Sequence, residues 1–177
     1  MSKSNHFVPE KIFLIGYMGS GKTTVGVALA KLLGWYFLDL DTEIEKQEKK
    51  SIGEIFSLYG EEAFREIESK VLRTLKNIHP TVIATGGGTA AFHDNLAWMN
   101  NVGSTVYLRT HPGTLFHRLA PVKATRPLIS NLPDVDVMEF ILENIKKRLP
   151  YYVQAKHTVS GEESPTSVAR TIQLLLS

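Results

Sequence analysis

The stretch GYMGSGKT, residues Gly16 to Thr23, decides the fold of this chain. It matches the phosphate-loop pattern G-x-x-x-x-G-K-[ST]; the apolar stretch KIFLI precedes it, and residues 24–33 follow with apolar side chains at helical spacing. Such a loop needs a strand to deliver it, glycines whose backbone N–H groups surround phosphate oxygens, and a helix whose positive end faces the anion. The sequence therefore predicts a nucleoside triphosphate site here, in preference to an ordinary Gly-rich turn.

Two side chains at the end of this loop are suited to a nucleotide and its metal ion. Lys22 adds a positive point charge for the phosphates, and the hydroxyl of Thr23 can bind a magnesium ion. The residues expected to contact the nucleotide here are Gly19, Ser20, Gly21, Lys22, Thr23 and Thr24.

The composition of the chain limits its domain organisation and its partners. A length of 177 residues with 43% hydrophobic content suffices for one substantial core, so we expect a single domain over residues 1–177. The formal net charge is +2 and the charges are interspersed, which argues against a nucleic-acid partner. The absence of cysteine excludes disulfides and a cysteine zinc site. No apolar run has the length of a signal peptide's core or a membrane span, so we expect a cytoplasmic protein without a membrane partner.

Strand-like and helix-like stretches alternate along the chain, which predicts an α/β fold of three layers, with helices on both faces of a five-stranded parallel sheet. Ligands of such sheets bind beyond the carboxyl ends of the strands. Residues 120–133 contain prolines and are weakly periodic, so we interpret them as a mobile lid. Strands are expected at residues 11–15, 35–41, 81–85, 104–110 and 157–160, and helices at residues 23–33, 42–49, 51–59, 61–78, 90–100, 111–119, 135–153 and 165–176.

Two aspartates end the second expected strand, in the stretch FLDLD. Because side chains alternate along a strand, Asp39 and Asp41 are expected to point to the same side and to face the nucleotide. Many phosphate-loop proteins place a metal-supporting Asp after a strand further along, but here the third strand runs into TGGG without an acid. This favours the pair for supporting a cation and orienting an acceptor hydroxyl. The alternative is that either aspartate only caps the following helix.

Further candidates are a triple glycine and three arginines. Gly86 to Gly88 end the third strand and would let a ligand approach the backbone, although a flexible turn is the alternative. Arg126, in the expected lid, could stabilise the charge of a transferring phosphate. Taken alone, Arg65 and Arg148 look like solvated residues on helices.

Together, these residues resemble the shikimate kinase family over nearly the whole chain. The resemblance rests on the order and spacing of GYMGSGKTTVG, FLDLD, SIGEIF, FREIE, TGGGT, TRPLI and RLPYY. It implies a phosphate-loop kinase that uses ATP and Mg²⁺ to phosphorylate the ring 3-hydroxyl of shikimate, a step toward chorismate and the aromatic amino acids. We also expect the protein to be a monomer.

The resemblance also implies roles for residues around the phosphates. By position, Lys22 holds the ATP phosphates, Thr23 binds Mg²⁺, and Asp39 supports the metal through water. Asp41 contacts the shikimate hydroxyls and either takes the proton from the attacking one or only orients it. Arg126 comes from the lid, so that the implied catalytic set is Lys22, Asp41 and Arg126.

For the acceptor, the resemblance implies a site formed largely by the helical region 42–78. Arg65 and Arg148 would bind the shikimate carboxylate, because a guanidinium fork matches a carboxylate with two hydrogen bonds. The backbone of Gly87, flanked by Gly86 and Gly88, would contact the substrate. The rings of Phe56 and Phe64 would form a wall.

The chain departs from the family pattern on the adenine side and in the lid. An Asp often follows the last strand of the family, but here residues 160–162 read Ser-Gly-Glu, which leaves Arg118 and Pro165 as neighbours of the base. The lid has fewer basic residues than in many relatives, so its second cation is Lys123 or is absent. Two rival readings stay open: a related small-molecule kinase such as a gluconate kinase, and a non-catalytic nucleotide-binding switch.

Overall fold

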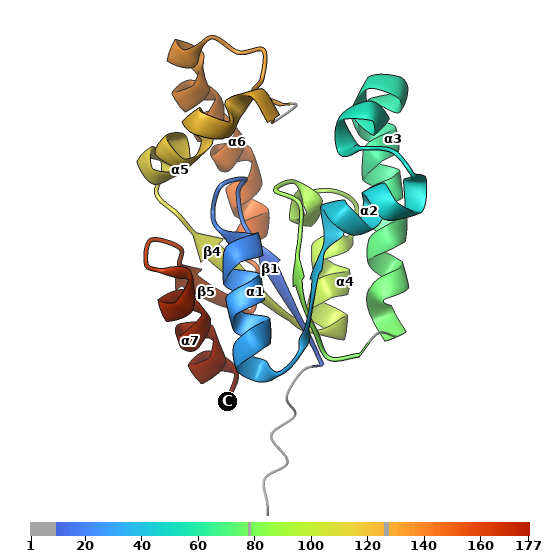
Figure 1. Cartoon of the computed structure of the whole chain (residues 1–177), viewed down its shortest axis with the longest axis vertical. Helices are drawn as coiled ribbons and strands as arrows, with labels where there is room; N and C mark the ends of the chain where they lie inside the picture. Colours follow the sequence, from blue (N-terminus) through green and yellow to red (C-terminus); the bar gives the residue numbers. More distant parts are fainter. Residues whose placement is uncertain (1–9, 78, 126–127) are drawn as a thin grey trace, which may run out of the picture.

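The fold is built on a parallel sheet whose strands lie in the order β2-β3-β1-β4-β5 (Figure 1). The computed structural model describes residues 10–77, 79–125 and 128–177. All neighbouring strands of the sheet run parallel, as predicted from the alternation of strands and helices. The strands are β1 (Lys11–Ile15), β2 (Tyr36–Asp39), β3 (Thr81–Ala84), β4 (Ser104–Arg109) and β5 (His157–Ser160).

Helices cover both faces of this sheet, which confirms the predicted three-layer arrangement. One face packs against α1 and α7, and the other packs against α3, α4 and the end of α6. Along β1 the side chains alternate: Ile12 and Leu14 contact the first group, and Phe13 and Ile15 the second. The helices are α1 (Lys22–Leu33), α2 (Leu40–Glu48), α3 (Ile52–Thr74), α4 (Asn95–Val102), α5 (Pro112–Leu119), α6 (Asp134–Tyr152) and α7 (Pro165–Leu176), with the short 3₁₀ helices η1 (Leu75–Asn77), η2 (Thr89–Ala91) and η3 (Ala120–Thr125).

The second strand differs from its prediction in burial and in length. It was expected to be buried up to Asp41, but β2 is an edge strand whose Tyr36 is 67% exposed. The strand ends at Asp39, because the Asp39 side chain accepts a hydrogen bond from the backbone N–H of Asp41 at 3.1 Å and so caps α2. Asp41 therefore lies in the first turn of a helix and not at the end of a strand.

Helix α3 contains the interruption that its sequence predicts. Ser51 and Glu54 form the expected capping box at its start. Gly60, with φ 81° and ψ 175°, breaks the helical path, so that α3 consists of two helical parts. The second part ends at Thr74, and a short 3₁₀ helix leads on to Asn77. The helix expected at residues 90–100 is also shorter than predicted, because residues 89–91 form η2 and α4 begins only at residue 95.

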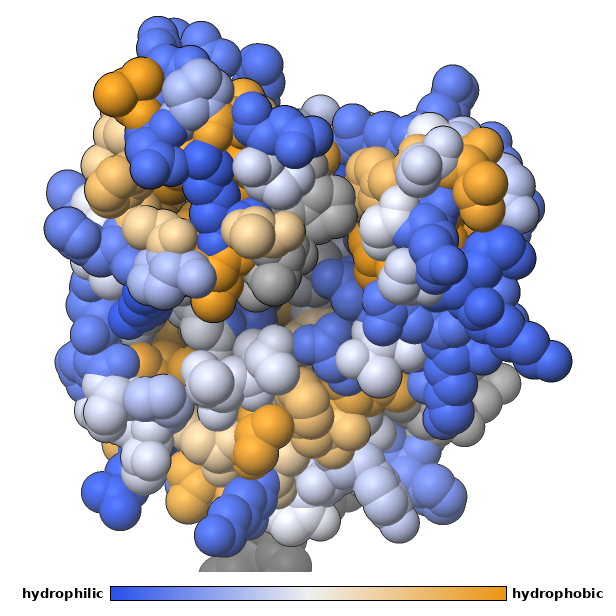
Figure 2. Space-filling model, turned by 45° about the horizontal axis from the view of Figure 1, so that its top comes forward, coloured by the Kyte–Doolittle hydropathy of each residue, from blue (hydrophilic) through white to orange (hydrophobic). Residues whose placement is uncertain are grey.

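A third apolar cluster lies above the sheet and joins the phosphate loop to the segment expected to be a lid. Tyr17 of the loop packs there with Leu119 of α5, with Val137 of α6, and with Ile129, which lies between these two helices in the sequence. The segment itself begins with η3, and the Lys123 ammonium lies 2.6 Å from an Asp134 carboxylate oxygen at the start of α6. Figure 2 looks toward this edge of the sheet and shows a hollow between the lobe of α5 and α6 and the lobe of α2 and α3. Among the described helices, none is both long and apolar enough to cross a membrane.

Candidate active site

Two cavities open side by side at the carboxyl ends of the strands. The larger, of about 630 Å³, follows the phosphate loop and the start of α1. The smaller, of about 100 Å³, lies against α3 and the C-terminal part of α6. Met18, Asp41, Gly86 and Gly87 line both cavities. Asp41 is the one acidic side chain among these four shared residues.

The phosphate loop has the backbone geometry of an anion site. Gly19 and Gly21 have φ angles of 80° and 92°, which residues with a Cβ rarely adopt. Gly21 precedes α1 without a side-chain cap, and the first turn of α1 carries no acid. The first N–H groups of the helix therefore remain available to an anion, and its positive end faces the cavity. The predicted nucleotide residues that line this cavity are Gly19, Ser20, Gly21, Lys22, Thr23 and Thr24.

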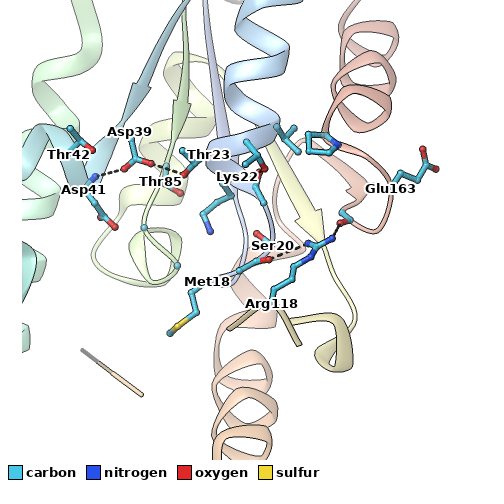
Figure 3. A pocket seen from close by; sticks show the side chains of 18 residues that line it. Met18, Ser20, Lys22, Thr23, Asp39, Asp41, Thr42, Thr85, Arg118 and Glu163 are labelled. Atoms are coloured by element: carbon cyan, nitrogen blue, oxygen red, sulfur yellow. Dashed lines mark hydrogen bonds between the residues drawn. The ribbon is translucent and has the colours of Figure 1, made fainter. Parts of the chain in front are cut away.

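Lys22 lies across the loop that precedes it. It is only 8% exposed, and its ammonium donates hydrogen bonds to the backbone oxygens of Gly16, at 2.8 Å, and Tyr17, at 2.9 Å. These bonds hold the positive charge at the edge of the larger cavity, where phosphates are expected (Figure 3).

The residues at the start of α1 and the end of β2 suit a magnesium ion. The hydroxyl of Thr23 donates to one carboxylate oxygen of Asp39 at 2.8 Å, and both line the larger cavity (Figure 3). Within the described residues there is no cluster of three or more His, Asp or Glu side chains that could hold a metal. Mg²⁺ commonly binds through one or two protein oxygens together with phosphates and water, so this donor set fits that ion. Asp39 thus caps α2 and also lines the cavity. Its function as a helix cap is therefore compatible with a function in binding the metal ion.

Asp41 is the carboxylate between the two cavities. Its pKa is raised to about 6, first by burial and then by the nearby carboxylates of Asp39 and Glu68, against the opposing effect of Lys22 and Arg65. A carboxylate with a pKa near neutrality can accept a proton from a hydroxyl group more readily than an ordinary Asp.

Arg65 is buried, which corrects its interpretation as a solvated helix residue. It is 5% exposed, and its guanidinium donates to Glu68 at 2.8 Å and to Glu61 at 3.2 Å. Glu68 is fully buried and also accepts from the hydroxyl of Thr89 at 2.6 Å. The position of Arg65 in the smaller cavity is therefore set by a buried carboxylate that is itself hydrogen-bonded.

Arg148 is buried as well, so its interpretation as a solvated helix end is also wrong. It is 8% exposed and lies over the Tyr17 ring, and its charge lowers the pKa of Tyr152, one turn further along α6, against the larger effect of burial. The hydroxyl of Tyr152 donates to the backbone oxygen of Gly87. Arg148 and Arg65 line the same small cavity, which gives it two positive groups.

The triple glycine packs closely against these arginines and their neighbours. A Cβ on Gly88 would lie 2.5 Å from a terminal nitrogen of Arg65, and one on Gly86 would lie 2.8 Å from a carboxylate oxygen of Glu68. A Cβ on Gly87 would lie 3.1 Å from the backbone nitrogen of Met18. Side chains at these positions would therefore press on groups that line the smaller cavity.

The other predicted residues divide between the two cavities. Phe56 and Phe64 line the smaller one, with ring centroids 4.5 Å apart. The Arg118 guanidinium donates to the backbone oxygens of Gly19 and Gly161 (Figure 3). Arg118 and Pro165 both line the larger cavity. Arg126 lies outside the described residues.

Some residues of the site had no role in the sequence analysis. Glu68 stands three positions after Arg65, a spacing that places both side chains on one helix face and could have revealed it. Met18 and Tyr152 carry no comparable local signal, because their positions depend on contacts with Gly86 to Gly88.

The fold and the two cavities define a phosphate-loop kinase of a small molecule. Residues 18–176 match the family model "Shikimate kinase". The chain is 45% identical over 153 residues to a shikimate kinase of Phocaeicola vulgatus, a match that covers 86% of this chain and 87% of that one. The chain belongs to the shikimate kinase family.

Solved structures agree with this assignment. A shikimate kinase from Bacteroides thetaiotaomicron superimposes with a TM-score of 0.88 at 42% identity, covering 94% of this chain and 97% of that chain. A shikimate kinase from Acinetobacter baumannii, in complex with shikimate, gives a TM-score of 0.89 at 35% identity, covering 97% and 94%. A gluconokinase from Sinorhizobium meliloti gives 0.62 at 16% identity, covering 96% and 92%, so it shares only the fold.

Proposed function

We propose that this chain transfers the γ-phosphoryl group of ATP to the 3-hydroxyl of shikimate, giving shikimate 3-phosphate and ADP on the route to chorismate and the aromatic amino acids. The observation that carries the proposal is the shared border of the two cavities at Asp41, with two buried arginines in the smaller one. Shikimate carries one carboxylate and several hydroxyls. Two arginines and an adjacent carboxylate match those groups.

In this proposal the larger cavity binds ATP. The N–H groups of the loop and the positive end of α1 surround the phosphates, and the Lys22 ammonium balances their charge. Thr23 and Asp39 would hold Mg²⁺, which when bound neutralises developing phosphate charge. Arg118 and Pro165, which also line this cavity, would flank the base.

The smaller cavity would bind shikimate. Arg65 and Arg148 would donate hydrogen bonds to its carboxylate, Arg65 through guanidinium hydrogens that are not bonded to Glu61 or Glu68. The backbone of Gly87 contacts a ring hydroxyl, and Phe56 and Phe64 pack against the ring. This arrangement turns the 3-hydroxyl toward Asp41 and the phosphates beyond it.

Asp41 would act on the attacking hydroxyl. As the bond between the 3-oxygen and the γ-phosphorus forms, the bond from phosphorus to the bridging oxygen breaks and its electron pair leaves with ADP. The hydroxyl proton passes to the Asp41 carboxylate, whose raised pKa suits it for this task. Positive charge near the phosphates comes from Lys22 and, in the proposal, from Arg126.

The segment 120–133 would close over the site and exclude water, which otherwise competes with the hydroxyl for the phosphoryl group. Leu128 of this segment lines the smaller cavity together with Arg148, so the segment already forms part of its wall.

A coupled ADP-release assay tests the proposal against its rivals. We expect turnover with shikimate, and at most slow ATP hydrolysis with gluconate or without an acceptor. Preference for gluconate would indicate the related sugar-acid kinase, and absence of turnover with every acceptor would indicate a nucleotide-binding switch. Identification of shikimate 3-phosphate by mass spectrometry and phosphorus NMR establishes the product.

The proposal includes a monomeric enzyme that works in the cytoplasm, where ATP is made and used. The residues that line the two cavities come from one chain, which supports this part of the proposal. Size-exclusion chromatography with light scattering at assay concentrations tests this, and activity that appears only in an oligomeric fraction would contradict it.

A further inference from the structure

Each buried arginine of the smaller cavity lies over an aromatic ring from another part of the chain. The guanidinium carbon of Arg65, in α3, is 4.4 Å from the centroid of the Phe92 ring, just after η2. That of Arg148, in α6, is 5.4 Å from the centroid of the Tyr17 ring, in the phosphate loop. Both distances are within the range of about 6 Å over which a ring face attracts a cation.

The Tyr17 side chain can act on the acceptor only through its neighbours. It is 2% exposed, and it lines neither cavity. Its hydroxyl makes no hydrogen bond to the described residues, and burial raises its pKa to about 12, so it stays neutral. The part of the side chain in contact with Arg148 is therefore the ring. The ring also packs in the third apolar cluster, a structural role that an experiment has to separate.

Phe92 has a similar relation to the other arginine. Arg65 contacts two rings, because its guanidinium carbon also lies 5.0 Å from the Phe64 centroid. Its Nε is buried without a hydrogen-bond partner among the described residues. Phe64 lines the smaller cavity, whereas Phe92 does not. Phe92 thus contacts the arginine without contacting the contents of the cavity.

A ring beneath a guanidinium restricts its tilt and leaves the donors on its edge free. A carboxylate accepts two parallel hydrogen bonds only from an edge that lies near its own plane. A side chain that is already oriented loses less conformational freedom on binding. We propose that Tyr17 and Phe92 are positioning residues that orient Arg148 and Arg65 for the carboxylate of the acceptor. This inference rests on the proposed function, in which these arginines bind shikimate.

The contacts predict an effect on the acceptor and not on the nucleotide. Tyr17 also contacts Lys22, but through its backbone oxygen, which accepts from the ammonium at 2.9 Å. A substitution of the Tyr17 side chain leaves that oxygen in place. Phe92 lies outside the lining of the larger cavity. Removing either ring should therefore weaken binding of shikimate while binding of ATP persists.

The experiment compares Tyr17→Leu and Phe92→Leu, which remove a ring, with Tyr17→Phe and Phe92→Tyr, which keep one. We expect each leucine variant to raise the KM for shikimate by about three- to thirty-fold, with kcat and the KM for ATP within about two-fold of wild type. The two aromatic variants should restore the wild-type KM for shikimate. The affinities for shikimate, measured by calorimetry in the absence of ATP, should rank the variants in the same order.

A matched control removes an arginine–ring contact elsewhere. The guanidinium carbon of Arg73 lies 5.0 Å from the Trp98 centroid, and neither residue lines either cavity. Trp98→Leu should lower the thermal unfolding midpoint but leave the KM for shikimate unchanged. Thermal unfolding of every variant shows which ones fold. Phe92 is only partly buried, so its substitution should destabilise the fold less than substitution of Tyr17.

The outcomes separate this inference from the function on which it rests. Wild-type turnover with an unchanged KM for shikimate in both leucine variants overturns the inference alone. A parallel rise of the KM for shikimate and the KM for ATP shows a merely structural role and also overturns the inference. The same holds if the aromatic variants fail to return the KM for shikimate to its wild-type value. A wild-type enzyme that transfers no phosphate to shikimate contradicts the proposed function and, with it, this inference.

Discussion

At the scale of the residue, Asp41 carries the strongest expectation about chemistry. Asp41→Asn keeps the shape of the side chain but cannot accept a proton, so we expect turnover to fall by about 10²- to 10⁴-fold. ATP should bind nearly as before, because Lys22 and the loop are untouched. Single-turnover kinetics and nucleotide titration measure the two effects. Turnover at the wild-type rate would remove Asp41 from the chemistry.

The raised pKa of Asp41 predicts opposite effects of pH on activity and on stability. Activity needs the ionised carboxylate, so kcat/KM for shikimate should fall as the pH drops through about 6. The folded protein binds this proton more tightly than the unfolded chain, so Asp41 stabilises the fold at low pH. This contribution disappears as the pH rises through about 6.

At pH 8, Asp41→Asn should therefore raise the free energy of unfolding by about 1 to 3 kcal/mol. The lower figure applies if solvent screens part of the electrostatic effect at this side chain. Urea unfolding of both proteins at pH 5 and pH 8 checks this, and a variant less stable than wild type at pH 8 would contradict the assignment.

Glu68 acts on two neighbours at once, which makes its substitution informative. Glu68→Gln keeps a hydrogen-bond acceptor for Arg65 but removes the charge that helps to raise the pKa of Asp41. We expect the KM for shikimate to rise by about ten-fold, because a buried guanidinium loses its counter-charge. The acid limb of the pH profile should also move to lower pH. Glu66→Gln, on an exposed part of the same helix, is the matched control, and an acid limb that stays in place would contradict the electrostatic role of Glu68.

At the scale of the element, the break in α3 separates the part that carries Phe56 from the part that carries Arg65. Gly60 has φ 81° and ψ 175°, a conformation that only glycine adopts readily, and nothing lies within 4 Å of a Cβ placed there. Gly60→Ala should therefore destabilise the protein by about 1–3 kcal/mol through backbone strain alone.

Gly53→Ala is the control for this prediction, since Gly53 lies in the same helix without a positive φ and with open space around its Cβ. That variant should be neutral or stabilising by up to about 1 kcal/mol, because alanine favours helix more than glycine does. Denaturant unfolding compares the two. Equal effects would show that the interruption of α3 does not depend on Gly60.

At the scale of the whole molecule, the two cavities lie on either side of one border, and a metal is expected on one side only. Removal of divalent cations with EDTA should abolish phosphoryl transfer, because Thr23 and Asp39 would lose the ion that neutralises phosphate charge. Shikimate should still bind, because the arginines of the smaller cavity do not depend on a metal. Calorimetry in EDTA, with restoration of turnover by Mg²⁺, tests this, and loss of shikimate binding in EDTA would contradict it.

Local patterns predicted much of this architecture. The phosphate loop, the five strands, the capping box of α3 and the break at Gly60 all depend on residues close together in the chain, and all were confirmed. The end of β2 was wrong because the expected alternation took no account of Asp39 capping the next helix. Its exposure was missed because the sequence does not tell which strand lies at the edge of a sheet.

By itself, the sequence determined that a nucleotide-binding loop begins an α/β fold and that Asp39 and Asp41 belong near it. Only the tertiary structure decided that Arg65 and Arg148 are buried. Arg65 is buried against Gly88 and Phe92, and Arg148 against Tyr17 and Gly87. These neighbours come from distant parts of the chain, so no local pattern reports the burial. A solvated helix arginine and a buried one share the same local sequence signal, and the packing around them makes the difference.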